Sequence, residues 1–326
     1  MPSTGSLILP PDNFRLVQPV PTGQSREESY IISFDTSGID RLERENERDR
    51  KALIAGLRTF GLVRITGLNV SESLSIQGEH RAERLRLLAD LTGPFNPLQP
   101  PNTLLADIAC AYQQRRGSVS LGDDACWIAI QAPERVDDAM AAESHQWHQD
   151  REDWFVGMNR ELREAYSPIF KKYRNQRPRS AAFLMRYFIG RGPEYWDMLL
   201  IPIYERQTGH RPSHEEFERC LKRVPAWAMF WLARIYALYR RAVRPNKHGK
   251  KNAGLNDLDS AIYLPFCDLF VTNDVRQRRA LRVVNAANPR KTKIVSYDAL
   301  RSRLFGIQSE PMSNVALPQG RVRQAP

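Results

Sequence analysis

Long apolar runs are missing from this sequence of 326 residues. No run approaches the roughly 20 residues that a helix needs to span a bilayer, which argues against a membrane-spanning protein. The opening residues, "MPSTGSLILPPDNF", also lack a basic start followed by a long apolar stretch. We therefore expect no secretory signal at this end of the chain.

Cysteine is scarce in this chain. The four cysteines are scattered and form no CxxC pair: Cys110, Cys126, Cys220 and Cys267. Such spacings are typical of neither a zinc site nor a disulfide framework. Together with the lack of a secretory signal, they lead us to expect a cytoplasmic protein with reduced thiols.

Acidic residues are absent from two long segments, 219–251 and 276–293, although both carry many lysines and arginines. The whole chain has a formal net charge of +11. Lysine and arginine neutralise phosphates and release counterions, so this distribution favours nucleic acid as the partner. The alternative is that the charge only aids solubility.

The sequence does contain an alternation of β-prone and helical segments toward both ends of the chain. Residues 30–37 and 61–70 have the composition of buried strands, and residues 39–60 and 71–91 have helical spacing. After residue 254 the order is helix, strand, helix, strand, helix, over residues 256–264, 269–272, 275–287, 293–297 and 298–305. This alternation predicts an α/β layer fold with a parallel sheet.

The region between these two parts is mostly helical and aromatic, with residues 124–132 as its one β-prone run. We interpret the aromatic stripe at 227–241 as a buried helix face, with base stacking as the alternative. The predicted organisation is an extended N-terminal segment (1–27), a first half of the α/β domain (28–91), a mainly helical insertion (92–254), a second half of the domain (255–308) and a C-terminal tail (309–326).

Carboxylates recur where strands end or helices begin: Asp35, Glu72, Asp257, Asp259 and Asp274. Ligands of open parallel sheets bind at the carboxyl ends of the strands, so we expect these side chains at one edge. Several carboxylates brought together cannot all stay ionised without a cation between them. Oxygen ligands suit Mg²⁺ or Mn²⁺, and such ions can activate a water molecule that attacks a phosphodiester bond.

The order of "ISFDTS" (32–37), "LNVSES" (68–73), "NDLDSAIYLPFCDLFVTND" (256–274) and "KIVSYDALRSRL" (293–304) resembles the PIN-domain family of metal-dependent nucleases. That family includes the ribonuclease toxins of bacterial toxin–antitoxin pairs. The resemblance covers about a third of the chain. It implies a three-layer α/β/α domain with a parallel central sheet, interrupted here by a helical insertion that the compact toxins lack.

The resemblance also implies roles for individual residues. Asp35, Glu72 and Asp274 would be the first, second and last metal-binding acids. Asp259 fits the third position best, with Asp257 as the alternative. Thr36 and Thr272 match the hydroxyls beside these acids, and four arginines after Asp274 would position phosphates: Arg276, Arg278, Arg279 and Arg282.

The resulting hypothesis is a Mg²⁺- or Mn²⁺-dependent endoribonuclease that cleaves single-stranded RNA. An antitoxin-like protein inhibitor and a homodimer are further partners to test. The alternative is a non-catalytic protein that keeps the fold and binds nucleic acid or protein through its insertion.

Several of these residues also have ordinary structural interpretations. Asp35 suits a turn, Glu72 a helix dipole and Asp257 a helix N-cap. Asp268 is expected only to close the turn before the strand. The histidine pairs His145/His148 and His210/His214 have no third soft ligand in evidence, so we interpret them as polar or structural.

Overall fold

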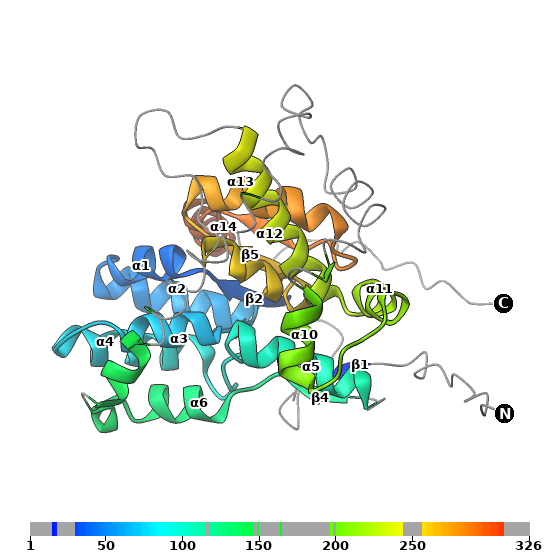
Figure 1. Cartoon of the computed structure of the whole chain (residues 1–326). Coiled ribbons are helices and arrows are strands. Elements are labelled where there is room, and N and C mark those ends of the chain that lie inside the picture. The colour runs from blue at the N-terminus through cyan, green and yellow to red at the C-terminus, as the bar shows by residue number, and fades with distance from the viewer. Residues whose placement is uncertain are drawn as a thin grey trace, which may run out of the picture.

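A parallel sheet with the strand order β3-β2-β5-β6 lies inside a largely helical chain (Figure 1). Its strands are β2 (Tyr30–Phe34), β3 (Gly61–Arg64), β5 (Leu269–Val271) and β6 (Lys293–Val295). The computed structural model describes residues 15–17, 30–114, 118–137, 139–146, 149, 164, 196–197, 200–243 and 256–309. Because β2 pairs with β5, strands from the two predicted halves of the α/β domain share one sheet. The predicted α/β class with a parallel sheet agrees with this topology.

The first half of the chain forms more helices than the sequence predicted. They are α1 (Thr36–Glu43), α2 (Glu47–Phe60), α3 (Gly67–Leu74) and α4 (Glu79–Thr92). The single helix expected at 39–60 was wrong, because Asn46 accepts a 2.9 Å hydrogen bond from the Asp49 amide and begins α2. The second strand also ends early, because Thr66 and Asn69 form a capping box that begins α3.

The middle of the chain is helical, as predicted. Its elements are α5 (Pro101–Gln113), α6 (Asp124–Gln131), the short 3₁₀ helix η1 (Pro133–Arg135), α10 (Leu200–Thr208), α11 (His214–Arg223) and α12 (Pro225–Val243). The β-prone interpretation of residues 124–132 was wrong, because Asp123 caps a helix there by accepting a 2.7 Å bond from the Cys126 amide. The predicted helices at 150–176 and 180–190 lie almost entirely outside the described residues.

Two short strands pair outside the main sheet. β1 (Arg15–Val17) runs parallel to β4 (Ser118–Ser120), so a piece of the predicted N-terminal segment contacts the predicted insertion.

The last part of the chain follows the predicted order of elements. η3 (Asn256–Phe266) precedes β5, and α13 (Val275–Val284), η4 (Asn285–Ala287) and α14 (Tyr297–Ser309) complete it. The helix expected at 256–264 is a 3₁₀ helix and contains Pro265 near its end.

Residues on the two faces of the sheet belong to different apolar clusters. Leu269 and Val271 of β5 pack with Ile32 and Phe34 of β2, together with side chains of α1, α2, α4 and α14. Phe270, between them on β5, packs with α5, α10, α11, α12 and α13. This alternation is the period of two that a strand buried on both faces requires.

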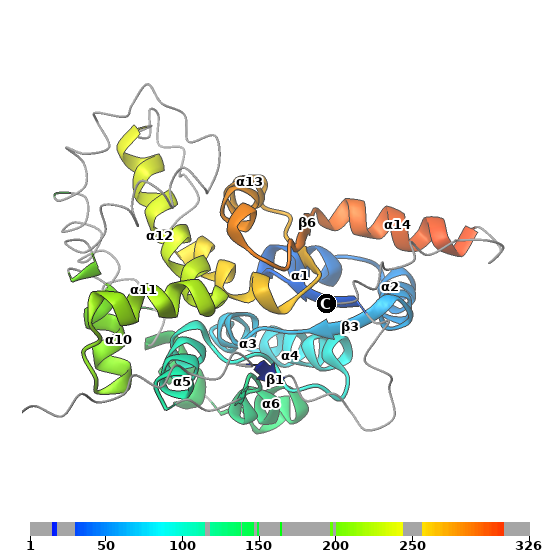
Figure 2. The same ribbon diagram turned by 90° about the vertical axis from the view of Figure 1, so that its right-hand side faces the viewer.

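The aromatic stripe of α12 lies in the second of these clusters. Trp227, Phe230 and Trp231 are all buried, so the predicted burial of this face is confirmed. Figure 2 shows α10, α11 and α12 on one side of the described molecule and α2 and α14 on the other. Since α12 packs on η3, the predicted insertion and the second half of the α/β domain share one core.

None of the helices in the described ranges has the length and apolar character needed to cross a bilayer.

Candidate functional site

Two of the predicted acids begin helices at the carboxyl edge of the sheet. Asp35 follows β2 and caps α1, and Asp274 lies three residues after β5 and caps α13. Asp274 Oδ1 accepts bonds of 2.6 Å from the Arg276 amide and 2.9 Å from the Gln277 amide. Capping explains both positions locally, because an aspartate satisfies amides that a helix start leaves without a partner.

Asp35 has partners beyond its own helix. Its carboxylate accepts hydrogen bonds from Ser37 Oγ at 2.8 Å, from Thr272 Oγ1 at 3.3 Å and from Gln277 Nε2 at 3.0 Å. These donors come from α1, from the residue after β5 and from α13. The carboxyl ends of the two central strands are therefore joined through the Asp35 carboxylate.

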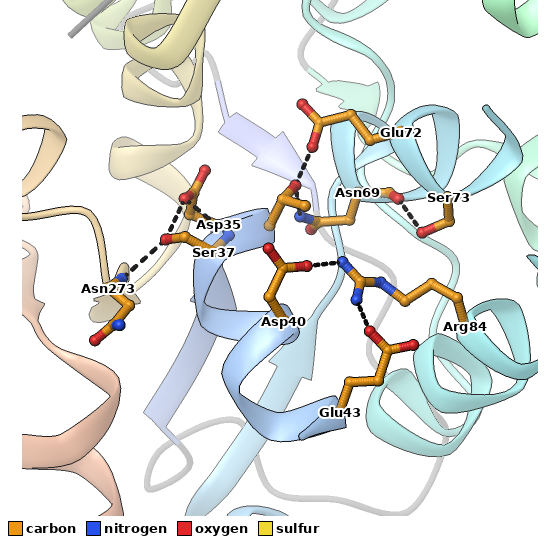
Figure 3. Close-up of polar contacts among 10 residues, drawn as sticks. Asp35, Ser37, Asp40, Glu43, Asn69, Glu72, Ser73, Arg84 and Asn273 are labelled. Atoms are coloured by element: carbon orange, nitrogen blue, oxygen red, sulfur yellow. Dashed lines mark hydrogen bonds and ion pairs between the residues drawn. The ribbon is translucent and has the colours of Figure 1, made fainter. Parts of the chain in front are cut away.

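Ser37 connects the Asp35 side of this network to the Asp274 side. Its hydroxyl oxygen accepts bonds from the Asn273 amide at 2.9 Å and from the Asp274 amide at 3.2 Å. Figure 3 shows Ser37 between the Asp35 carboxylate and Asn273. One serine thus holds the start of α1 against the turn that carries Asp274.

Glu72 reaches the same edge from α3. The Thr36 hydroxyl donates a short hydrogen bond to Glu72 Oε2 and accepts one of 3.4 Å from Asn69 Nδ2 (Figure 3). Since Thr36 directly follows Asp35, the structure brings Glu72 next to the Asp35 network. The sequence placed Glu72 at a helix start, whereas it lies in the last turn of α3.

Asp259 is engaged elsewhere. Its carboxylate forms a 2.6 Å ion pair with Arg234 of α12, and both side chains are buried. Its neighbour Ser260 lies closer to the network, with Oγ 3.3 Å from Gln277 Nε2. Asp257 belongs to η3, but its side chain is outside the described residues.

The described side chains do not gather into a preformed metal centre. Within the described ranges, no three His, Cys, Asp or Glu side chains lie close enough to share an ion. Asp35, Glu72 and Asp274 offer the carboxylate oxygens that a hard cation prefers, but they do not converge on one point in this structure. Asp259 does not fit in this arrangement, because Arg234 neutralises it.

Arg84 supports the helix that carries Thr36. Its guanidinium, buried on α4, forms short ion pairs with Asp40 and Glu43 of α1 (Figure 3). These contacts fix α1 against α4 and so hold the start of α1 in place.

The four predicted phosphate-binding arginines divide into two pairs. Arg278 donates to the Thr272 carbonyl at 3.4 Å, and Arg282 donates to the Ile294 carbonyl at 2.9 Å. Arg276 and Arg279 are exposed on α13. The first pair stabilises the chain around β5 and β6, whereas the second pair is available to a ligand.

Asp268 has the structural role that the sequence predicted. Its carboxylate accepts a 2.8 Å bond from the Ile31 amide and pairs with Arg290 at 2.8 Å. It therefore ties the start of β2 to the turn before β5, at the end of the sheet opposite the acids.

Histidines and thiols offer little competing chemistry among the described residues. His214 pairs with Asp197 at 2.8 Å, and His145 contacts Gln149 at 2.9 Å. His148 lies outside the described residues. Burial raises the pKa of the thiols of Cys126, Cys220 and Cys267, which disfavours the nucleophilic thiolate.

Sequence reasoning missed Ser37, Gln277 and Ser260. Gln277 stands three residues after Asp274, a spacing typical of a capped helix start, so a signal for a local role was present. Nothing in that spacing reveals that its side chain reaches Asp35.

Comparisons with protein-family models, with curated proteins and with solved structures found no match to this chain.

Proposed function

We propose that this protein is a metal-dependent endoribonuclease with a three-layer PIN-like domain, cleaving single-stranded RNA. The observation that supports the proposal is that hydrogen bonds bring the segments carrying Asp35, Glu72 and Asp274 to one edge of the sheet. Thr36, the residue after Asp35, donates to the Glu72 carboxylate, and the Ser37 hydroxyl contacts both the Asp35 carboxylate and the Asp274 backbone amide. Parallel sheets bind ligands at this edge.

The charge around this edge supports a polyanionic substrate. Arg276 and Arg279 follow Asp274 on α13, and the segment that contains them has no acidic residue. Acidic side chains alone would repel RNA, so a nuclease needs such cations beside its carboxylates. The exposed pair would hold the phosphates of the strand.

Within this proposal, Asp35, Glu72 and Asp274 are the residues that would hold Mg²⁺ or Mn²⁺. The bound ion would supply an activated water and stabilise the leaving oxygen of the phosphodiester. Thr272 and Gln277 orient the Asp35 carboxylate by hydrogen bonds, and Thr36 orients Glu72. Asp257 and Asp259 stay predicted ligands, and Asp259 would have to leave Arg234 to serve.

Cleavage of a fluorescently labelled single-stranded RNA tests the proposal. The purified protein, supplied with Mn²⁺ or Mg²⁺, is compared with the Asp35→Asn and Glu72→Gln variants. Both variants keep the shape of the side chain and remove its charge. We expect cleavage to fall by at least about a hundredfold, the scale on which loss of a catalytic group slows a reaction.

Asp90→Asn provides the matched control, since Asp90 is an exposed acid on α4 away from the edge. It should cleave at the wild-type rate. Equal cleavage by the wild type and Asp35→Asn would remove the catalytic claim and trace the activity to a contaminant or another site.

The second candidate is a non-catalytic protein that binds nucleic acid through the same fold. The observation that favours it is the buried pairing of Asp259 with Arg234, which withdraws one predicted ligand from the edge. This candidate predicts RNA binding that EDTA does not weaken and no cleavage with either metal ion.

A further inference from the structure

A pocket lies where α12, η3 and α13 meet, beside the edge of the sheet that carries Asp35, Glu72 and Asp274 (the acidic edge). It has a volume of about 190 Å³. Arg240 of α12 and Arg276 and Arg279 of α13 supply its charged side chains. Tyr236, Leu258 and Ala280 supply an apolar part of its wall. Figures 1 and 2 show α12 and α13 lying together, as their contacts require.

Among the described residues, none pairs with the three guanidinium groups of this arginine pocket. In the part of the chain that the structure describes, none of them forms a hydrogen bond or an ion pair, and no carboxylate lines the pocket. Several other arginines of the fold do contact carboxylates, among them Arg84, Arg234, Arg290 and Arg301. Three like charges around one cavity repel one another, and an anion between them would remove that cost.

The chemistry of the pocket suits one kind of anion. Arginine presents a planar fork of donors that matches the oxygen atoms of phosphate, and three such groups surround this cavity. The volume is below that of a typical drug-sized pocket, so it suits a phosphate with its adjoining sugar better than a large ligand. The apolar wall gives the sugar or base a surface to pack on.

The pocket is also next to the acids. Arg276 lies two residues after Asp274, and Leu258 lies two residues before Ser260, whose Oγ is 3.3 Å from Gln277 Nε2. Gln277, between the two pocket arginines of α13, turns toward Asp35 instead. One face of α13 therefore serves the acidic edge, and the adjacent face lines the pocket.

We propose that the arginine pocket is a phosphate-binding subsite that holds one phosphate of a nucleic-acid strand and so fixes the strand relative to the acids. The choice of nucleic acid as the source of that phosphate rests on the proposed function. The binding itself needs neither metal nor cleavage. The phosphate is either internal to the strand or at its 5′ end.

Fluorescence anisotropy with a short single-stranded RNA, labelled at its 3′ end, tests the subsite. EDTA is present throughout, so that no cleavage occurs. Arg279→Glu on α13 and Arg240→Glu on α12 are compared with the wild type. Each should weaken binding by about tenfold or more, the loss expected when a phosphate contact of arginine is replaced by repulsion.

Arg86→Glu is the matched control, because Arg86 is exposed on α4 and the substitution changes the net charge equally. It should change the affinity by less than about twofold. Thermal unfolding of all the variants checks that they are folded. Equal weakening by Arg86→Glu, or unchanged binding by both pocket variants, would overturn the subsite.

Two arms of the experiment identify the source of the phosphate. Tighter binding of a 5′-phosphorylated RNA than of its 5′-hydroxyl counterpart, lost in Arg279→Glu, assigns the pocket to a terminal phosphate. Equal binding of the two RNAs, with both weakened by Arg279→Glu, assigns it to an internal phosphate.

The subsite and the nuclease can fail separately. Pocket-dependent binding without any cleavage would support the phosphate-binding subsite and contradict the nuclease proposal. Cleavage that depends on Asp35, combined with unchanged binding by Arg240→Glu and Arg279→Glu, would do the reverse.

Discussion

Asp35 Oδ1 accepts a 3.0 Å hydrogen bond from Gln277 Nε2, although the two residues are 242 positions apart in the chain. Gln277 is buried, and its Oε1 makes a short contact with the Thr272 hydroxyl, whose single proton it shares with the Asp35 carboxylate. One neutral side chain therefore links the acid after β2, the threonine after β5 and helix α13.

Replacement of this side chain should loosen the edge of the sheet. In Gln277→Ala, the partly buried Asp35 loses one of its donors and the buried Thr272 loses an acceptor. We expect the free energy of unfolding to fall by about 1–3 kcal/mol, the scale of losing a hydrogen bond to a charged group. Urea unfolding measures the change. Gln113→Ala, on the exposed end of α5, should stay within about 0.5 kcal/mol of the wild type. Equal unfolding curves for the two variants would contradict the linking role.

The buried pair of Arg234 and Asp259 should be strongly coupled. Removal of either partner leaves a buried charge behind, so Arg234→Met and Asp259→Asn should each cost about 3 kcal/mol of unfolding free energy. The double variant should cost clearly less than the sum of the two single variants.

An exposed pair of the same length supplies the comparison. Lys51 and Glu47 are also 2.6 Å apart, but both are largely solvent-exposed on α2, so their coupling should be much weaker than that of the buried pair. An equally weak coupling for Arg234 and Asp259 would mean that Asp259 is not committed to Arg234. It would then be available to the acidic edge.

Arg64 of β3 is a charge that the fold buries at a cost. The residue is 2% exposed, its Nε and Nη2 have no hydrogen-bond partner among the described residues, and burial lowers its pKa to about 10. Arg64→Met replaces it with an apolar side chain of similar length. We expect the free energy of unfolding of this variant to be about 1–4 kcal/mol higher than that of the wild type near neutral pH.

The pH dependence of the same variant has a definite sign. The folded pKa of Arg64 lies well below its ordinary value, so the unfolded chain binds the proton more tightly. Wild-type stability should therefore rise, relative to Arg64→Met, as the pH increases above about 10 toward the ordinary pKa of arginine. Denaturant unfolding of both proteins across this range measures the difference. A constant difference would show that Arg64 is not perturbed.

The sequence was a good guide where one interaction dominates. The buried run before Asp35 predicted β2 correctly, and the aromatic stripe of α12 predicted its burial. It failed where a short polar signal competes with hydrophobic spacing. Asn46 caps the start of α2 and so divides the single helix expected at 39–60. Asp123 caps the start of α6, so the apolar residues 124–132 form a helix instead of the expected strand.

The site was predictable only in part, for a related reason. Strand ends and helix starts place Asp35 and Asp274, because topology alone brings those positions to one edge. The pairing of Asp259 with Arg234 could not be predicted, since it depends on how α12 packs on η3. The same packing creates the arginine pocket. The sequence indicated basic segments on both α12 and α13, but not that their arginines line one cavity.

The Ile31 amide of β2 bonds to an aspartate 237 residues later in the chain. A ribosome adds about 5–20 residues per second, so roughly 10–50 s pass before β5 can take its place beside β2. During that time β2 has only β3 as a neighbour and presents a bare strand edge, a template for pairing with other chains. Synthesis is therefore the period in which this protein is most exposed to aggregation.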